Sequence, residues 1–271
     1  MISVLNSVSQ LGAENALSST QASLQKTLLQ LSTGLKINSG SDDAAGLSIA
    51  SGLGASISAL TQSSQNASNG VGLLQTADGA LSQVTSLLNR AVTLATEASN
   101  GGLTGPQSTA ADTEYQSILS EITQIGSTTN FNGSAVFSAT PMTTFTSDGT
   151  TGGTTTTSTT TGALSATSLG LTSDLTSIKN ATASLTAITA AIDTVSATRG
   201  SIGASVNQLT ADQNVENTQV TNLTSAQNNV QNADISATVA KMTQYNVLEQ
   251  TGMAALSQSN QAQQAVLKLL Q

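Results

Sequence analysis

The sequence between residues 53 and 95 reads LGASISALTQSSQNASNGVGLLQTADGALSQVTSLLNRAVTLA. Steps of four and three residues along it, from Leu53 to Ala95, land on thirteen positions, and ten of these are apolar. This spacing puts the apolar side chains on one stripe of a helix and is typical of a coiled-coil seam. At 1.5 Å per residue the helix would be about 65 Å long. Few compact domains contain such an element.

The ends of this helix carry their own signals. Ser41 is expected to cap it, with Asp42 and Asp43 close to the positive end of the helix dipole. Asn100 and the glycines at 101 and 102 are expected to end it. A second seam runs from Leu185 to Val230, and a shorter third one runs through residues 111–125. Three helices with matching seams are expected to pack as a bundle.

The two ends of the chain also show helical apolar stripes, and both are mostly uncharged. Helices of this kind are marginal in water by themselves, so we expect them to be loose in a monomer and ordered by neighbouring copies. The residues predicted to form this polymerisation seam are Leu24, Leu28, Leu31, Leu35, Val239, Met242, Met253, Leu256, Leu267 and Leu270.

The middle of the chain differs from both ends. Asn132-Gly133 lies between short apolar runs and predicts a hairpin. Of the 22 residues from Thr140 to Thr161, 13 are Thr, which predicts an exposed loop or a very small insertion. The fold class is therefore mainly α: a long coiled-coil-like helical bundle from the N- and C-terminal segments, with a small β-hairpin or loop element in the middle.

This layout predicts three regions. Residues 1–40 and 235–271 form a terminal coiled-coil domain. Residues 41–139 and 172–234 form a helical-bundle domain with a small β-hairpin. Residues 140–171 form a Thr-rich variable loop or insert.

Composition excludes several classes of function. The chain has no Cys and no His, so it offers neither a disulfide framework nor the commonest general base and metal ligand. Only 8% of residues are charged and the net charge is −8, which argues against nucleic acid as a partner. No run of 18 apolar residues predicts a membrane span, and residues 1–10 do not resemble a Sec-type signal peptide. We expect no enzyme activity and no cofactor.

Several motifs resemble those of bacterial flagellins. They are the run from Leu31 to Ser39 with residues 42–46, residues 67–70 leading into residues 75–81, residues 129–133, residues 232–236, residues 254–261 and the closing residues 266–271. Together they cover about residues 1–135 and 180–271. Many flagellins carry large outer domains in the middle, whereas this chain has only about 45 residues there.

The resemblance implies a structural subunit that self-assembles into the flagellar filament for swimming motility. The terminal domain would line the inner tube and the helical-bundle domain the outer tube. Family members are secreted unfolded through the flagellar type III export channel. The implied partners are other subunits, the hook-associated junction and cap proteins, an export chaperone and a host Toll-like receptor. The alternative is a hook–filament junction protein, which usually has a distinct middle domain.

Some residues allow two interpretations. Asn89, Arg90, Leu94 and Glu97 lie in the segment through which the family meets the receptor. Arg90 and Leu94 match the family pattern, whereas Asn89 and Glu97 replace the usual glutamines. The alternative is that this face serves filament packing. Arg199, on a seam position, is either a local ion pair or a register contact between subunits. Capping explains Asp42 and Asp43 without a metal.

The Thr tract also allows two interpretations, a solvated loop or an O-glycosylated one. The residues that would carry glycans are Thr154, Thr155, Thr156, Thr157 and Ser158.

Overall fold

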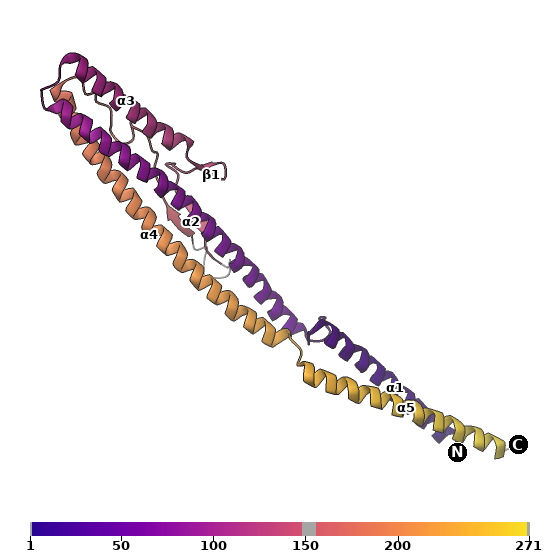
Figure 1. The fold of residues 1–271 in the computed structure, drawn as a ribbon. Helices are drawn as coiled ribbons and strands as arrows, with labels where there is room; N and C mark the ends of the chain where they lie inside the picture. Colours follow the sequence, from indigo (N-terminus) through magenta and orange to yellow (C-terminus); the bar gives the residue numbers. More distant parts are fainter. Residues whose placement is uncertain (1, 148–155, 270–271) are drawn as a thin grey trace. The chain divides into compact units, whose positions relative to one another are not determined.

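The structure, a computed structural model, describes residues 2–147 and 156–269. Its elements, labelled in Figure 1 where there is room, are α1 (Ile2–Thr33), α2 (Ala44–Ser99), α3 (Gly105–Thr128), β1 (Asn130–Phe131), β2 (Ser134–Ala135), β3 (Met142–Phe145), β4 (Thr156–Thr159), α4 (Ile178–Gln231) and α5 (Ile235–Leu269). The predicted fold class, mainly helical with a small β-element in the middle, is confirmed.

The chain divides into two compact units. Unit 1 comprises Met1–Ala55 and Leu223–Gln271, and unit 2 comprises Ser56–Asn222. Helices α2 and α4 contribute residues to both units, whereas α1 and α5 belong to unit 1 and the remaining elements to unit 2.

Unit 2 is built on the antiparallel pairing of α2 and α4. Ser63 contacts Glu216, and Asp78, fifteen residues further along α2, contacts Arg199, which lies earlier on α4. All thirteen positions of the first predicted seam and all fourteen of the second are buried or partly buried, as a coiled-coil seam requires. The apolar stripes read from the sequence therefore do face one another.

Helix α2 is also buried along a second stripe. Gly70, Ala77, Val84, Ala91 and Ala98 follow one another at seven-residue spacing, and all five are buried. Figure 1 shows the reason, since α3 lies on one side of α2 and α4 on the other. Small side chains on this stripe let a third layer approach closely, which gives unit 2 a continuous core.

Helix α3 begins with a capping box. The backbone N–H of Thr104 donates to the side chain of Gln107 at 2.8 Å, and Pro106 lies in the first turn, where its missing N–H costs nothing. Tyr115, Ile118 and Ile122 of the predicted third seam are buried.

The predicted hairpin forms between β1 and β2. Asn132 and Gly133 have φ values of 51° and 80°, the positive pair that a type I′ turn requires. The turn prediction is therefore confirmed.

The Thr tract forms strands in its described part. Its described part holds a second antiparallel pair, β3 with β4, in which Phe145 pairs with Thr156 and Met142 with Thr159. Thr144, Thr157 and Thr159 are buried, so one face of the hairpin packs inward. Of the two alternatives, an exposed loop and a very small insertion, the described residues fit the second, because β-branched Thr favours strands and alternate Thr side chains of this hairpin are buried.

Unit 1 is built on the antiparallel pairing of α1 and α5. The Gln10 amide donates to Asn260 at 3.1 Å, and Gln21, further along α1, donates to Glu249, which lies earlier on α5. A two-bond backbone bridge closes the pair, with Lys36 N donating to Gln231 O and Ala233 N donating to Gly34 O. This bridge fixes the register of the two helices.

The N-cap of α2 is Asp43, not Ser41. The Asp43 carboxylate accepts a hydrogen bond from the Gly46 N–H at 2.9 Å, the third residue of the helix. The Ser41 hydroxyl instead contacts the Ser39 hydroxyl. The prediction placed the cap two residues early because both Ser and Asp are good caps and the sequence alone does not choose between them.

One 18-residue window of α2 reaches a mean hydropathy of 1.4, which by length and composition would suit a membrane. The same helix supplies many of the buried residues of the unit 2 core, including Leu74, Leu81 and Leu88. Only 17% of the residues in the apolar window itself are buried, so packing within the subunit leaves most of this window uncovered.

Gly126 offers a test of the core of unit 2. A Cβ at this position would meet the backbone oxygen of Leu164, whereas a Cβ at the exposed Gly79 of α2 would meet nothing within 4 Å. We expect Gly126→Ala to lower the free energy of unfolding by about 1–3 kcal/mol or more, as overpacking against backbone does. Gly79→Ala, the control, should raise it by about 0.5–1 kcal/mol. Urea denaturation checks both, and equal effects would contradict the packing described.

Candidate interaction surface

Large apolar side chains are exposed mainly on unit 1. Of the twelve exposed ones in the described part of the chain, ten belong to unit 1 and two, Ile178 and Val215, belong to unit 2. The ten are Val8, Leu11, Leu28, Leu29, Ile49, Ile235, Val239, Val247, Leu248 and Met253. Exposed apolar side chains that are concentrated on one unit of a protein are typical of a surface that meets another protein.

The interior of unit 1 is correspondingly thin. Among its described residues only two hydrophobic side chains, Ile37 and Ala50, are buried, whereas the contiguous core of the molecule lies in unit 2. A pair of helices can bury only one stripe of each. Unit 1 therefore keeps much of its apolar surface available to a partner.

The predicted polymerisation seam divides into two sets. Leu24, Leu31, Leu35, Met242 and Leu256 are half-buried in unit 1. Leu28, Val239 and Met253 are exposed, at 47%, 39% and 50%. The side chain of Leu267 and the whole of Leu270 lie outside the described residues.

The seam that α1 and α5 share within the chain follows heptad spacing. On α1 it passes through Ala13, Leu17, Leu24 and Leu31, with Thr20 and Thr27 between them, all buried or half-buried. An ideal Cβ on Gly252 of α5 would lie 3.4 Å from Leu17, so the backbones come close.

The predicted polymerisation seam omits seven of the exposed apolar residues of unit 1: Val8, Leu11, Leu29, Ile49, Ile235, Val247 and Leu248. Leu11 and Leu29 are eighteen residues apart, which is five full helical turns, so they share a face of α1. That face lies opposite the heptad seam. Because Asn15 and Ser18 lie between them on the same face, the sequence showed no continuous apolar period that would have revealed this face.

The connection between α1 and α2 is held by Asp42. Its carboxylate contacts the Lys26 ammonium at 2.7 Å and accepts hydrogen bonds from the N–H groups of Asn38 and Ser39, both at 3.1 Å. The hydrogen bond from Lys26, then the one from Asn38, lowers the pKa of Asp42 to about 2. This carboxylate therefore fixes the turn that brings the chain from α1 into α2.

The proposed receptor or packing face on α2 is reduced from four residues to three. Asn89, Arg90 and Glu97 are exposed, but Leu94 is only 4% exposed and belongs to the core of unit 2. Arg90 is bound to Glu114 of α3 by two hydrogen bonds, at 2.7 and 3.1 Å. This pair raises the pKa of Arg90 and lowers that of Glu114.

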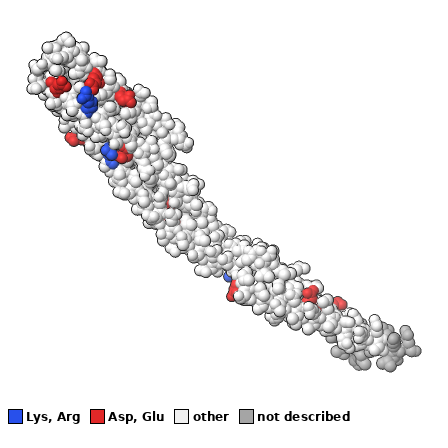
Figure 2. Space-filling view, in the orientation of Figure 1, with Lys and Arg blue, Asp and Glu red and all other residues white. Residues whose placement is uncertain are grey.

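Arg199 forms an ion pair within the chain. Its guanidinium donates to both carboxylate oxygens of Asp78, at 2.7 and 3.3 Å, and the two residues occupy seam positions of α4 and α2. The local interpretation of Arg199 is therefore confirmed. Figure 2 shows a surface with few charged side chains, on which basic and acidic groups adjoin one another.

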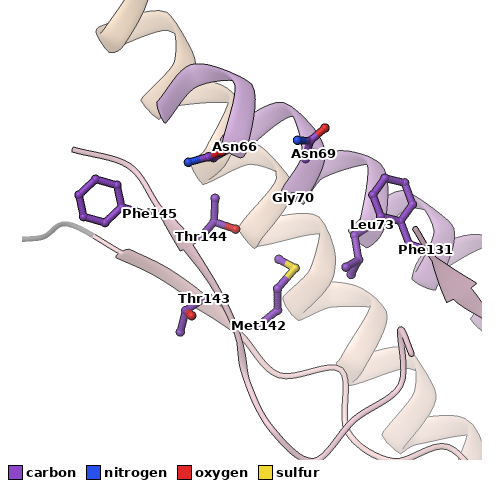
Figure 3. Close-up of a pocket in the computed structure, with 9 residues that line it drawn as sticks. All are labelled: Asn66, Asn69, Gly70, Leu73, Phe131, Met142, Thr143, Thr144 and Phe145. Atoms are coloured by element: carbon purple, nitrogen blue, oxygen red, sulfur yellow. The ribbon is translucent and has the colours of Figure 1, made fainter. Parts of the chain in front are cut away.

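A shallow groove of about 350 Å³ runs between α2 and the β3 strand, in unit 2 (Figure 3). The side chains that line it are mainly apolar: Leu73, Phe131, Met142 and Phe145, with Asn66 and Asn69 at its edge. Gly70 forms its floor, and a Cβ there would lie 2.8 Å from the Thr144 hydroxyl. The missing side chain lets the hairpin seat against the helix.

Two of the proposed glycan acceptors are exposed and one is not. Thr156 and Ser158 point outward from β4, whereas Thr157 is buried and donates its hydroxyl to Asp212 at 3.3 Å. Thr154 and Thr155 lie outside the described residues. Strand alternation thus separates acceptors that the sequence grouped together.

Within residues 2–147 and 156–269, no group of three acidic or other metal-binding side chains comes together. Asp42 is bound to Lys26 and Asp43 caps α2, so both have structural partners.

Comparison with known proteins agrees with this geometry. The family model for the bacterial flagellin N-terminal helical region matches residues 4–142, and the model for the C-terminal helical region matches residues 185–270. The flagellin of Halalkalibacterium halodurans is 36% identical over 248 residues, which is 91% of each chain. Flagellin 1 of Proteus mirabilis is 38% identical over 46% of this chain but only 34% of its own length.

The crystal structure of Bacillus cereus flagellin is also similar, with 28% identity and a TM-score of 0.49 over 56% of this chain and 88% of that one.

Two helical pairs, with most of the exposed apolar surface on one of them, are the features of a structural protein that assembles. The chain belongs to the bacterial flagellins. It is a structural subunit of the flagellar filament, an extracellular homopolymer, and not an enzyme. None of these observations favours a hook–filament junction protein.

The Asp42 contacts predict a pH effect on the α1–α2 connection. The pKa of Asp42 is about 2 in the folded chain and 3.8 for an unperturbed aspartate. The ionised carboxylate therefore stabilises the fold fully above pH 3.8, and this stabilisation is lost as the pH falls through 2. Asp42→Asn should remove this effect at neutral pH and reduce hydrogen-exchange protection of the amides of Asn38 and Ser39. Asp193→Asn, at an exposed position of α4, is the control. Unchanged protection in Asp42→Asn would contradict the assignment.

Proposed function

We propose that the exposed apolar side chains of unit 1 are the surface through which subunits join in the filament. The observation that carries this proposal is their distribution, ten on unit 1 and two on unit 2. Burying one Met or Leu side chain against a neighbour contributes about 1.5–3 kcal/mol. A subunit that buries several of them on both sides gains enough to polymerise.

The exposed residues of α5 support a more specific arrangement. Ile235, Val239 and Met253 lie on one flank of this helix, next to the seam that faces α1. A second copy packed against this flank would complete the cover that α1 provides for the seam. In this arrangement the half-buried residues of the predicted polymerisation seam pack α1 against α5 within one subunit. The exposed residues of the seam contact the next subunit.

The same surface has to be protected before assembly. We infer that an export chaperone covers α5, since Val247, Leu248 and Met253 are exposed along it. A secreted, type III-exported chain has to pass the channel unfolded. The absence of Cys suits this route, because no disulfide has to be reduced, and the thin interior of unit 1 opposes unfolding weakly.

The remaining partners follow from membership of the family. Hook-associated junction and cap proteins would meet the first and last subunits through the same apolar surface. The face of Asn89, Arg90 and Glu97 is proposed as a packing surface between subunits. Recognition by a host Toll-like receptor is the alternative, and burial of Leu94 removes one of the four residues that the receptor would contact.

A pair of matched substitutions tests the surface. Met253→Gln in unit 1 and Ile178→Gln in unit 2 each replace an exposed apolar side chain, at 50% and 55% exposure, so neither should unfold the subunit. We expect Met253→Gln to raise the critical concentration for polymerisation roughly tenfold or more, because about 1.4 kcal/mol corresponds to tenfold. Ile178→Gln should leave it unchanged. Sedimentation of seeded filaments measures both, and equal effects would refute the proposal.

Deletion of α5 tests the role of unit 1 as a whole. A chain that lacks residues 235–271 leaves the α1 stripe uncovered and removes half of the exposed apolar residues of unit 1. We expect no filaments by negative-stain microscopy, while circular dichroism still shows the helices of unit 2, whose core lies elsewhere. Normal filaments from the truncated chain would overturn the proposal.

A further inference from the structure

Glu216 is a buried carboxyl group on the α4 seam that no part of the assembly function explains. Glu216 is 4% exposed, and it lies on a seam that also carries the buried residues Leu209 and Ile202, with Gln213 and Val220 as its nearest seam neighbours. One carboxyl oxygen, Oε2, is buried with no hydrogen-bond partner. Burial of an ionised carboxylate without a partner is costly, so such a group is normally neutral or paired.

The other carboxyl oxygen belongs to a chain of three groups from three elements. Ser63 Oγ of α2 lies 2.5 Å from Glu216 Oε1 and 3.2 Å from the backbone oxygen of Phe145 in β3. The hydroxyl has only one proton, and both neighbours accept when Glu216 is ionised. When Glu216 is protonated, its O–H donates to Ser63 Oγ, and the Ser63 O–H donates to Phe145 O. Each contact then has its own donor.

The surroundings favour the protonated form. On α4 the only other charged residue between positions 202 and 223 is Asp212, which is one turn away and has the same sign of charge. Residues 60–74 of α2 and the described residues of the hairpin, 142–147 and 156–159, carry no charged side chain. Asp148 lies outside the described residues. Burial, with Asp212 adding to it, raises the pKa of Glu216.

We propose that Glu216 is a proton-controlled latch that fastens the β3–β4 hairpin to both long helices of unit 2. In the protonated form it ties α4 to α2 and, through Ser63, to β3. On ionisation the single Ser63 proton is drawn to the carboxylate, Phe145 O loses its donor, and an unpaired negative charge remains in the seam. The hairpin is then held by its remaining contacts, among them the Thr157–Asp212 hydrogen bond.

The sign of the pH dependence follows. A group whose pKa is higher in the folded chain than in the unfolded chain contributes stability that is complete below the unfolded pKa and is lost as the pH rises through the folded pKa. The latch is therefore closed in acid and opens toward alkaline pH. This is the opposite direction to the effect expected of Asp42.

The test uses the full chain in its monomeric form. Glu216→Gln keeps a donor to Ser63 Oγ and has no charge, so it mimics the closed latch at every pH. We expect hydrogen-exchange protection of the β3 and β4 amides, corrected for intrinsic rates, to fall several-fold with rising pH in the parent chain and to stay level in Glu216→Gln. Asp212→Asn retains Glu216 but removes the neighbouring charge, so the fall should begin at lower pH.

A direct titration follows the latch at the carboxyl group itself. The chain has six glutamates, and the side-chain ¹³C resonance that is missing in Glu216→Gln identifies Glu216. The pH at the midpoint of the Glu216 titration should lie above the ordinary range of a glutamate. Ser63→Ala removes the hydroxyl that contacts Glu216, so it should shift this midpoint. A midpoint within that range, a protection profile shared by the parent and Glu216→Gln, or a carboxylate that stays ionised and is stabilised by added CaCl₂ would each overturn the proposal.

Discussion

The antiparallel seam between α2 and α4 is the interaction on which the rest of the molecule depends. It joins segments more than a hundred residues apart, and its polar contacts, Ser63 with Glu216 and Asp78 with Arg199, keep one register along the pair. Branched and small apolar side chains between these contacts supply the burial, while the few charges select the alignment. Once this register is set, α3 and both hairpins have a fixed surface to pack on, and unit 2 acquires the only contiguous core among the described residues.

Unit 1 is also built on two antiparallel helices, but their seam contains more polar residues and buries less apolar surface. Its two helices meet along a heptad stripe that contains Thr20, Thr27 and Thr238 as well as leucines, so little apolar area is buried within the chain. Two kinds of contact fix the register of these helices. One is the backbone bridge between residues 34–36 and residues 231–233, and the other is a set of side-chain amide contacts such as Gln21 with Glu249. The contiguous core thus lies in unit 2, whereas most of the exposed large apolar side chains in the described residues lie on unit 1.

Much of this could be read from the sequence, for physical reasons that differ between elements. The long helices were predictable because heptad spacing survives over many turns, and the first hairpin because Asn132-Gly133 admits few other conformations. The strands in the Thr tract were not, since Thr side chains do not reveal which face is buried. The interaction surface was only partly predictable: a helix has two flanks beside each seam, so Leu28 and Leu31 look alike until the partner helix is placed. Glu216 was visible only as a polar residue on a seam, and its burial became clear once Ser63 lay opposite.

The pairing of Phe145 with Thr156 has a consequence for insertions into this chain. Two residues paired across antiparallel strands lie side by side, so any stretch of polypeptide between them leaves and re-enters the fold at a single point. Its length can change by a few residues or by a whole domain without altering the spacing of the helices that carry it. The hairpin is therefore a position at which a segment of different length can be inserted without moving the helices that carry it.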